Sequence, residues 1–112
     1  MFGLPLPVLE LLQNYFSNHS QIIKVYIYGS RAMSRESPGS DIDLAIITNS
    51  ESDISGKVQA ELEELSTPYL FDVIDYQRIT NNSLQEHIDR AGKILFYEDL
   101  PNALSMILQS TS

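Results

Sequence analysis

The chain has 112 residues, of which 43% are hydrophobic and 20% are charged, a composition typical of one folded domain over residues 1–112. It contains no cysteine, which excludes disulfides, thiolate zinc sites and cysteine nucleophiles. Seven basic and fifteen acidic residues give a net charge of −8, which disfavours direct binding of nucleic acid and favours a basic protein or a metal-bound nucleotide. On composition alone, the charge could serve only to keep the protein soluble.

The first residues carry neither a basic segment nor a long apolar run, so we expect no secretory signal. The apolar runs of the chain are far shorter than a membrane-spanning helix. We therefore expect a cytoplasmic protein without a membrane partner. The two histidines, His19 and His87, lack a metal-ligand spacing and are expected at the surface.

The N-terminal half predicts one helix and two strands. A helix over residues 7–18 is predicted by apolar side chains at helical spacing: Val8, Leu11, Leu12 and Tyr15. Ile22–Tyr28 is β-branched and aromatic, which predicts a strand that Gly29 ends, and residues 31–35 predict a short helical turn. Ile42–Thr48 is almost continuously apolar, which predicts a second strand covered on both faces.

The C-terminal half alternates helices with strands. A helix is predicted by another apolar stripe: Ile54, Val58, Leu62 and Leu65. Residues 70–76 and Lys93–Tyr97 predict strands, and a capping box at residues 83–86 with a C-cap at Gly92 bounds the helix between them. After Pro101 we predict a last helix, whose stripe either packs on the sheet or binds another chain: Leu100, Leu104, Ile107 and Leu108. This alternation indicates one small sheet with helices against it.

The most informative motif is Gly29-Ser30, ten further residues, and then an Asp-x-Asp pair at the start of the second strand. A strand places residues i and i+2 on one face, so Asp41 and Asp43 point the same way. Paired carboxylates repel each other unless a proton or a cation lies between them, and Mg²⁺ prefers such oxygen ligands. Glycine allows a backbone to approach a phosphate closely. The motif therefore predicts a phosphate cradle beside a metal clamp.

Two aspartates compete as the third carboxylate of this site. Strand alternation puts Asp72 and Asp75 on opposite faces of the predicted strand. Asp72 lies within an apolar run, where an unpaired charge is costly, so it calls for a metal or an arginine as partner. Asp75 lies near the strand end and could be a turn or cap residue. We favour Asp72 as the functional aspartate; the structural alternative is a buried Asp72 paired with an arginine.

Three segments, Gly29-Ser30, residues 40–46 and Phe71–Asp75, resemble the signature of the DNA polymerase β-like nucleotidyltransferase superfamily. In detail the chain is similar to the minimal nucleotidyltransferases (MNT), small prokaryotic proteins often encoded beside a HEPN-domain partner. The resemblance implies an α/β (α+β) fold, a small mixed sheet with flanking helices like the polymerase β palm.

The same resemblance assigns the site. It implies that ATP is the substrate and that two Mg²⁺ ions are bound by the catalytic carboxylates Asp41, Asp43 and Asp72. It also implies a set of nucleotide-binding residues: Gly29, Ser30, Arg31 and Ser40. Arg31, like Arg35, could equally be a solvated loop residue.

For function, the resemblance implies transfer of AMP from ATP to a hydroxyl, by family likeness a tyrosine, of a HEPN toxin, which makes the chain an antitoxin. A single small domain leaves the acceptor to a partner, either a different protein or a second copy of the chain. Two alternatives stay open: a non-catalytic antitoxin that only binds its partner, and a nucleotidyltransferase for a small molecule such as an aminoglycoside. The complete set of carboxylates favours catalysis over binding alone.

Overall fold

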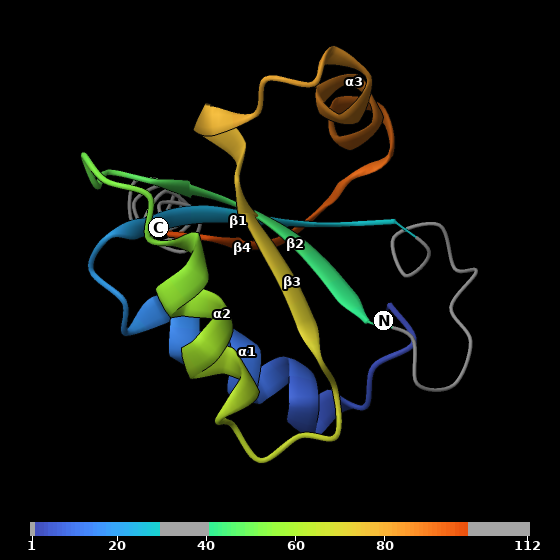
Figure 1. Ribbon diagram of the computed structural model, residues 1–112. Coiled ribbons are helices and arrows are strands. Elements are labelled where there is room, and N and C mark those ends of the chain that lie inside the picture. The colour runs from blue at the N-terminus through green and yellow to red at the C-terminus, as the bar shows by residue number, and fades with distance from the viewer. Residues whose placement is uncertain (1, 30–40, 99–112) are drawn as a thin grey trace, which may run out of the picture.

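The computed structural model of the protein describes residues 2–29 and 41–98. These residues form a four-stranded mixed sheet with helices on both faces, so the predicted α+β architecture is confirmed (Figure 1). The elements follow in the order α1 (Leu6–Ser17), β1 (Ile22–Tyr28), β2 (Ile42–Thr48), α2 (Ser55–Glu63), β3 (Phe71–Asp75), the 3-10 helix η1 (Tyr76–Arg78), α3 (Asn82–Ala91) and β4 (Lys93–Tyr97).

The strands lie in the order β3-β2-β1-β4. β1 is antiparallel to both of its neighbours, whereas β2 and β3 are parallel and are joined through α2. In the parallel register Asp43 lies opposite Asp72, so the starts of β2 and β3 meet at one end of the sheet. The antiparallel β1 ends there as well, because Tyr28 pairs with Asp43. Gly29 and two of the predicted carboxylates are thereby brought to the same end.

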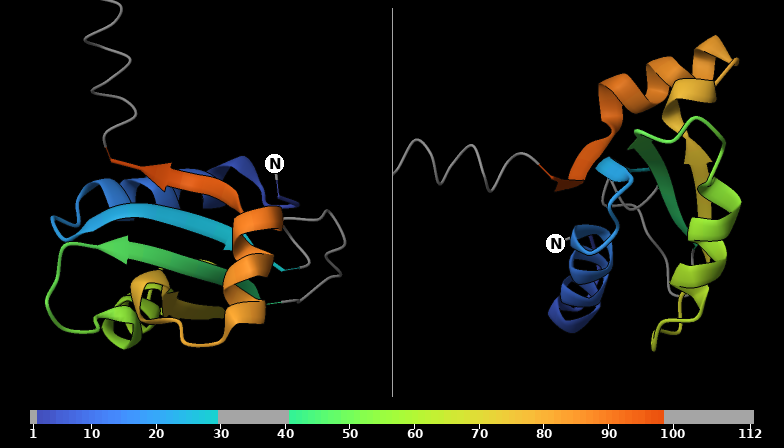
Figure 2. Two further views of the ribbon diagram at one scale, coloured as in Figure 1. Left: turned by 90° about the horizontal axis from the view of Figure 1, so that it is seen from above. Right: turned by 90° about the vertical axis from the view of Figure 1, so that its left-hand side faces the viewer.

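The two faces of the sheet are covered by different helices. α1 and α2 pack on one face and α3 on the other (Figures 1 and 2). The larger core, under α1 and α2, contains side chains without solvent exposure, among them Leu12, Phe16, Ile22, Val25, Ile27, Ile42, Leu44, Ile46, Val58 and Leu62. A smaller core under α3 is built from Tyr28, Ala45 and Ile88. The prediction that β2 is covered on both faces is confirmed.

The side of helix α1 that packs on the core differs from the apolar stripe predicted for it. Leu11 is exposed, whereas Leu9 and Phe16 take core positions together with Val8 and Leu12. Apolar residues occupy so many positions between Val8 and Phe16 that periodicity alone does not select one face. The existence of the helix was predicted correctly, but the side assigned to Leu11 was wrong.

The ends of α3 are set by Asn81 and Gly92. The predicted capping box is wrong, because the N-cap is Asn81, whose Oδ1 accepts a hydrogen bond of 3.1 Å from the Leu84 N–H. Gly92 is the C-cap as predicted, but its φ of −66° is ordinary for any residue. Glycine is needed there for space, because a Cβ would lie 2.5 Å from the Ile88 carbonyl oxygen.

β3 is an edge strand whose outward amides are bonded by side chains of α2. The Phe71 N–H donates to Glu63 Oε2 and the Val73 N–H donates to Gln59 Oε1, each at 3.0 Å. The helix that connects β2 to β3 thus supplies the acceptors that a further strand would otherwise provide.

The predicted turn at residues 31–35 and the predicted helix after Pro101, with its apolar stripe, lie outside the described residues. Within the described part of the chain, every helix is too short or too polar to cross a membrane.

Candidate active site

Asp43 and Asp72 face the α3 side of the sheet from neighbouring parallel strands. They are opposite each other in the register, while Ile42 and Leu44 point into the larger core. Asp43 is partly buried, whereas Asp72 and Asp41 are exposed. Burial, followed by the negative charges of Asp72 and Asp41, raises the pKa of Asp43. Asp72 and Asp41 therefore lie close enough for their charges to act on Asp43.

Carboxylates that repel one another are the donor set that suits a hard divalent cation, which would remove the repulsion that raises the pKa of Asp43. Within residues 2–29 and 41–98, however, no three acidic or histidine side chains lie close enough together to hold one metal ion. The chemistry of the site fits Mg²⁺, and convergence of Asp41, Asp43 and Asp72 on shared ions stays a prediction.

Gly29 lies against one of these carboxylates. Its φ of +74° falls in the left-handed region that side chains disfavour, and a Cβ there would lie 2.5 Å from Asp43 Oδ2. Both the turn and the close approach require glycine. The backbone that leaves β1 thus passes directly beside the Asp43 carboxylate. The other predicted nucleotide contacts, Ser30, Arg31 and Ser40, lie outside the described residues.

Two residues that sequence reasoning did not assign to the site adjoin it. Tyr28 is buried beside Asp43, and burial together with the charges of Asp43 and Asp72 raises its pKa to about 12, so the phenol stays protonated at neutral pH. His87 of α3 meets the Tyr28 ring edge-on, with ring centroids 6.4 Å apart. His87 is partly buried rather than on the open surface. For Tyr28 the available signal was its place directly before Gly29.

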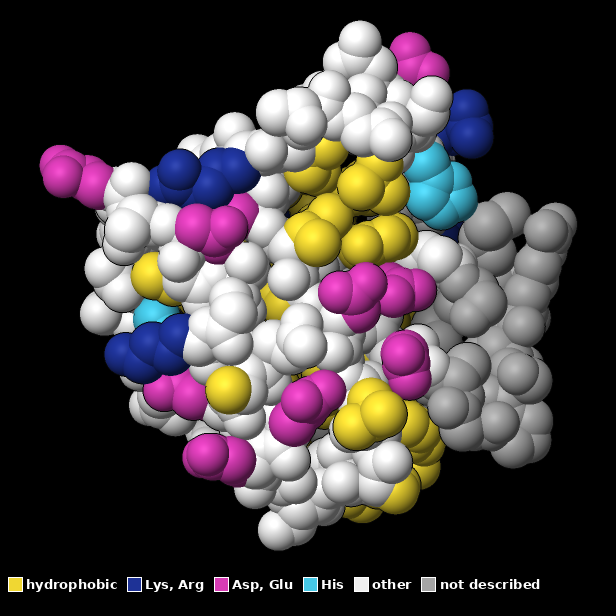
Figure 3. Space-filling model, in the orientation of Figure 1, with side chains coloured by type: hydrophobic (Ala, Val, Ile, Leu, Met, Phe, Trp, Pro, Cys, Tyr) yellow, Lys and Arg dark blue, Asp and Glu magenta, His cyan; other side chains and the backbone are white. Residues whose placement is uncertain are grey.

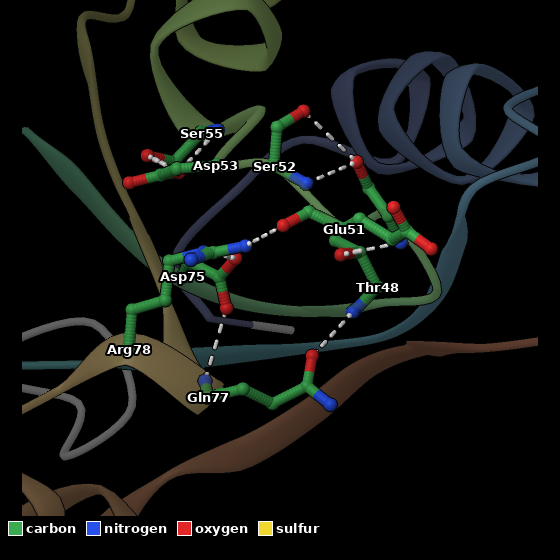
Figure 4. Close-up of polar contacts among 9 residues, drawn as sticks. Thr48, Glu51, Ser52, Asp53, Ser55, Asp75, Gln77 and Arg78 are labelled. Atoms are coloured by element: carbon green, nitrogen blue, oxygen red, sulfur yellow. Dashed lines mark hydrogen bonds and ion pairs between the residues drawn. The ribbon is translucent and has the colours of Figure 1, made fainter.

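The buried aspartate of β3 is Asp75, not Asp72. Asp75 Oδ2 forms an ion pair of 3.1 Å with Arg78 Nε, and its Oδ1 accepts from the Gln77 N–H at 3.0 Å (Figure 4). Arg78 also donates to the Glu51 carbonyl oxygen at 2.7 Å. The predicted alternation is confirmed, but the expectation of a buried Asp72 is wrong. Asp75 is both the cap of η1 and the aspartate paired with arginine.

The chain matches the model of the family described as polymerase beta, nucleotidyltransferase, over residues 10–100. The chain belongs to this nucleotidyltransferase family. The family predicted from the Gly-Ser and Asp-x-Asp motifs is thereby confirmed. Among curated proteins, none matches the sequence significantly.

Solved toxin–antitoxin complexes contain chains of the same fold. A chain from a toxin–antitoxin complex with AMP-PNP is 18% identical with a TM-score of 0.59, over 95% of this nucleotidyltransferase domain and 92% of that chain. A chain from the MntA–HepT complex is 18% identical with a TM-score of 0.59, over 93% of this domain and 86% of that chain. A chain from the complex of tri-AMPylated Shewanella oneidensis HEPN toxin with MNT antitoxin is 17% identical with a TM-score of 0.56, over 92% of this domain and 91% of that chain. The predicted resemblance to MNT proteins is thus confirmed at the level of the fold.

Proposed function

We propose that this nucleotidyltransferase transfers AMP from ATP to a tyrosine hydroxyl of a HEPN toxin and so acts as its antitoxin. The observation that carries the proposal is the pairing of Asp43 with Asp72 beside Gly29, in a chain of this family. It is supported by chains of the same fold in complexes described as holding AMP-PNP or a tri-AMPylated HEPN toxin. The net charge of −8 suits a basic surface on the partner.

In the proposed reaction the acceptor oxygen forms a bond to the α-phosphorus of ATP, the bond to the β-phosphate breaks, and pyrophosphate leaves. Asp41, Asp43 and Asp72 would hold two Mg²⁺ ions, which when bound neutralise phosphate charge and acidify the acceptor hydroxyl. The exposed Asp72 accepts the hydroxyl proton.

Phosphate binding is proposed for the turn that follows β1. The Gly29 backbone passes close to Asp43, so phosphates on this turn lie near the carboxylates. Ser30, Arg31 and Ser40 are the further nucleotide contacts in this proposal. Tyr28, paired with Asp43 in the register, remains protonated and so adds no further negative charge beside that carboxylate.

The test is to incubate the full chain with ATP labelled at the α-phosphate, Mg²⁺ and a HEPN protein. We expect label on a tyrosine of the partner, and loss of the label with Asp43→Asn or Asp72→Asn while the two proteins still bind. Binding without label by the unmodified chain would contradict catalysis and support an antitoxin that only binds. A parallel incubation contains an aminoglycoside in place of the HEPN protein; label on the aminoglycoside but not on the HEPN protein would support the small-molecule alternative.

A further inference from the structure

A hollow of about 300 Å³ lies at the C-terminal end of β3, between the start of α2 and the start of α3. Its apolar lining comes from β3, from the segment after η1 and from α3: Ile74, Ile79 and Leu84. In the space-filling view, hydrophobic side chains form a group on this face, and acidic side chains lie along one margin of it (Figure 3). An apolar surface therefore lies beside acidic side chains in this view.

The spacing along β3 connects the hollow to Asp72. Ile74 follows Asp72 on the same face, and residues i and i+2 of a strand are about 7 Å apart. A ligand with its charged end at Asp43 and Asp72 can therefore reach the hollow with its other end.

The rim of the hollow offers a hydrogen-bond acceptor and a donor. Asp53 accepts from the Ser55 N–H and hydroxyl at 2.9 Å and 2.7 Å, and these bonds lower its pKa, so Asp53 is an ionised acceptor. Asn81 uses its side-chain oxygen to cap α3 and carries an amide group that can donate. Small-molecule sites typically combine such an apolar lining with a few placed polar groups.

We propose that this hollow binds the base of the nucleoside triphosphate whose phosphates lie at the carboxylates; the inference rests on the proposed function. A heterocyclic base has apolar faces for Ile79 and Leu84, and a polar edge for Asp53 and Asn81. The competing occupant is the phenol ring of the acceptor. A phenol has one polar atom, its hydroxyl, which must lie at Asp72 to react. Asp53 and Asn81 would then find no hydrogen-bond partner on that ring.

The test compares the affinity of the full chain for ATP with its affinity for inorganic triphosphate, both with Mg²⁺, by isothermal titration calorimetry. Thr80→Trp fills the hollow from an exposed rim position, and Leu84→Ala removes part of its lining. Ser83→Trp is the matched control, because Ser83 is exposed, lies on the first turn of α3 and does not line the hollow. Melting temperatures of all variants confirm that each one folds.

We expect Thr80→Trp and Leu84→Ala to weaken ATP binding about tenfold or more, which is about 1.4 kcal/mol, and to leave triphosphate binding unchanged. Ser83→Trp should change neither affinity. If both variants keep normal ATP binding, or lose only transfer to the acceptor, the hollow does not hold the base and the inference is wrong while the proposed function stands. If the unmodified chain binds neither ATP nor triphosphate, the proposed function fails and this inference fails with it.

Discussion

Gly29 and Gly56 differ in what an added methyl group would meet. At Gly29 it would strike Asp43 Oδ2 on a backbone with positive φ, whereas at Gly56, within α2, it would meet nothing within 4 Å. The first glycine is required by the space it leaves to a carboxylate of the candidate site. The second has no such reason to be glycine and costs helix stability.

The substitution Gly29→Ala should destabilise the fold by about 1 kcal/mol or more and abolish nucleotidyl transfer, because the new Cβ displaces the Asp43 carboxylate. Gly56→Ala should instead stabilise the fold by about 0.5–1 kcal/mol and leave transfer unchanged. Denaturant unfolding and transfer assays on both variants check this. Normal transfer by Gly29→Ala would contradict a role for this turn.

The two aspartates of β3 should separate activity from stability. Asp72→Asn should abolish transfer without lowering the denaturation midpoint, because the side chain is exposed and its charge repels Asp43. Asp75→Ala should lower stability by about 1–3 kcal/mol, because it removes the acceptor for Arg78 and for the Gln77 N–H. Unfolding curves and transfer assays on both variants test this. Normal transfer by Asp72→Asn, with loss of transfer but normal stability in Asp75→Ala, would make Asp75 the functional aspartate.

The stability of the protein should depend on pH through Asp43. Its pKa in the folded chain is raised above the ordinary 3.8, so the unfolded chain loses this proton first as pH rises. The free energy of unfolding therefore falls as pH rises through the window between the two pKa values. Asp43→Asn should be more stable than the parent at neutral pH, with the difference vanishing below the ordinary pKa. Chemical unfolding at neutral pH and at a pH below 3.8 measures this difference in stability. A variant less stable than the parent at neutral pH would contradict a raised pKa of Asp43.

At the scale of elements, how much could be predicted depends on how sharply the residue pattern changes. β1, β2 and β4 have the predicted bounds, because their β-branched and aromatic runs end abruptly at glycine or polar residues. The exposure of Leu11 in α1 was not predicted, because apolar residues occur on too many sides of this helix for the pattern to select one. Alternation separated Asp72 from Asp75 but could not tell which one is buried, because that depends on what packs over each face.

Two candidate N-caps of α3, Asn81 and Ser83, lie within three residues of each other. Asn81→Ala should destabilise the protein by about 1 kcal/mol, because Asn81 Oδ1 accepts from the Leu84 N–H. Ser83→Ala, the matched change at the position the pattern had suggested, should have little effect. Thermal or urea unfolding of the two variants checks this, and a larger loss with Ser83→Ala would restore the predicted capping box.

At the scale of the whole molecule, the candidate site depends on topology that no single motif contains. Motif spacing placed Asp41 and Asp43 on one strand, but the contact between Asp43 and Asp72 needs the parallel register of β2 with β3. The crossover through α2, whose Val58 and Leu62 are fully buried, holds that register. The hollow beyond Asp72 likewise combines distant segments, so sequence reasoning had no signal for it.

The strong negative charge of the chain should make partner binding depend on salt. With a net charge of −8, association with a basic HEPN surface should slow and weaken as sodium chloride is raised, since added ions screen attraction between the two surfaces. Binding kinetics measured over a series of salt concentrations test this. An affinity that does not change with salt would indicate that charge serves solubility alone.

The hydrogen-bond acceptors that α2 places along β3 limit how another protein can bind to the strand that carries Asp72. An open strand edge is a template on which other chains add strands and aggregate. Here an incoming strand would meet Glu63 and Gln59 in place of free Phe71 and Val73 amides. The exposed Asp72 side chain nevertheless remains at this margin of the fold. A folded protein can therefore present one side chain to Asp72 without being drawn into the sheet by backbone pairing.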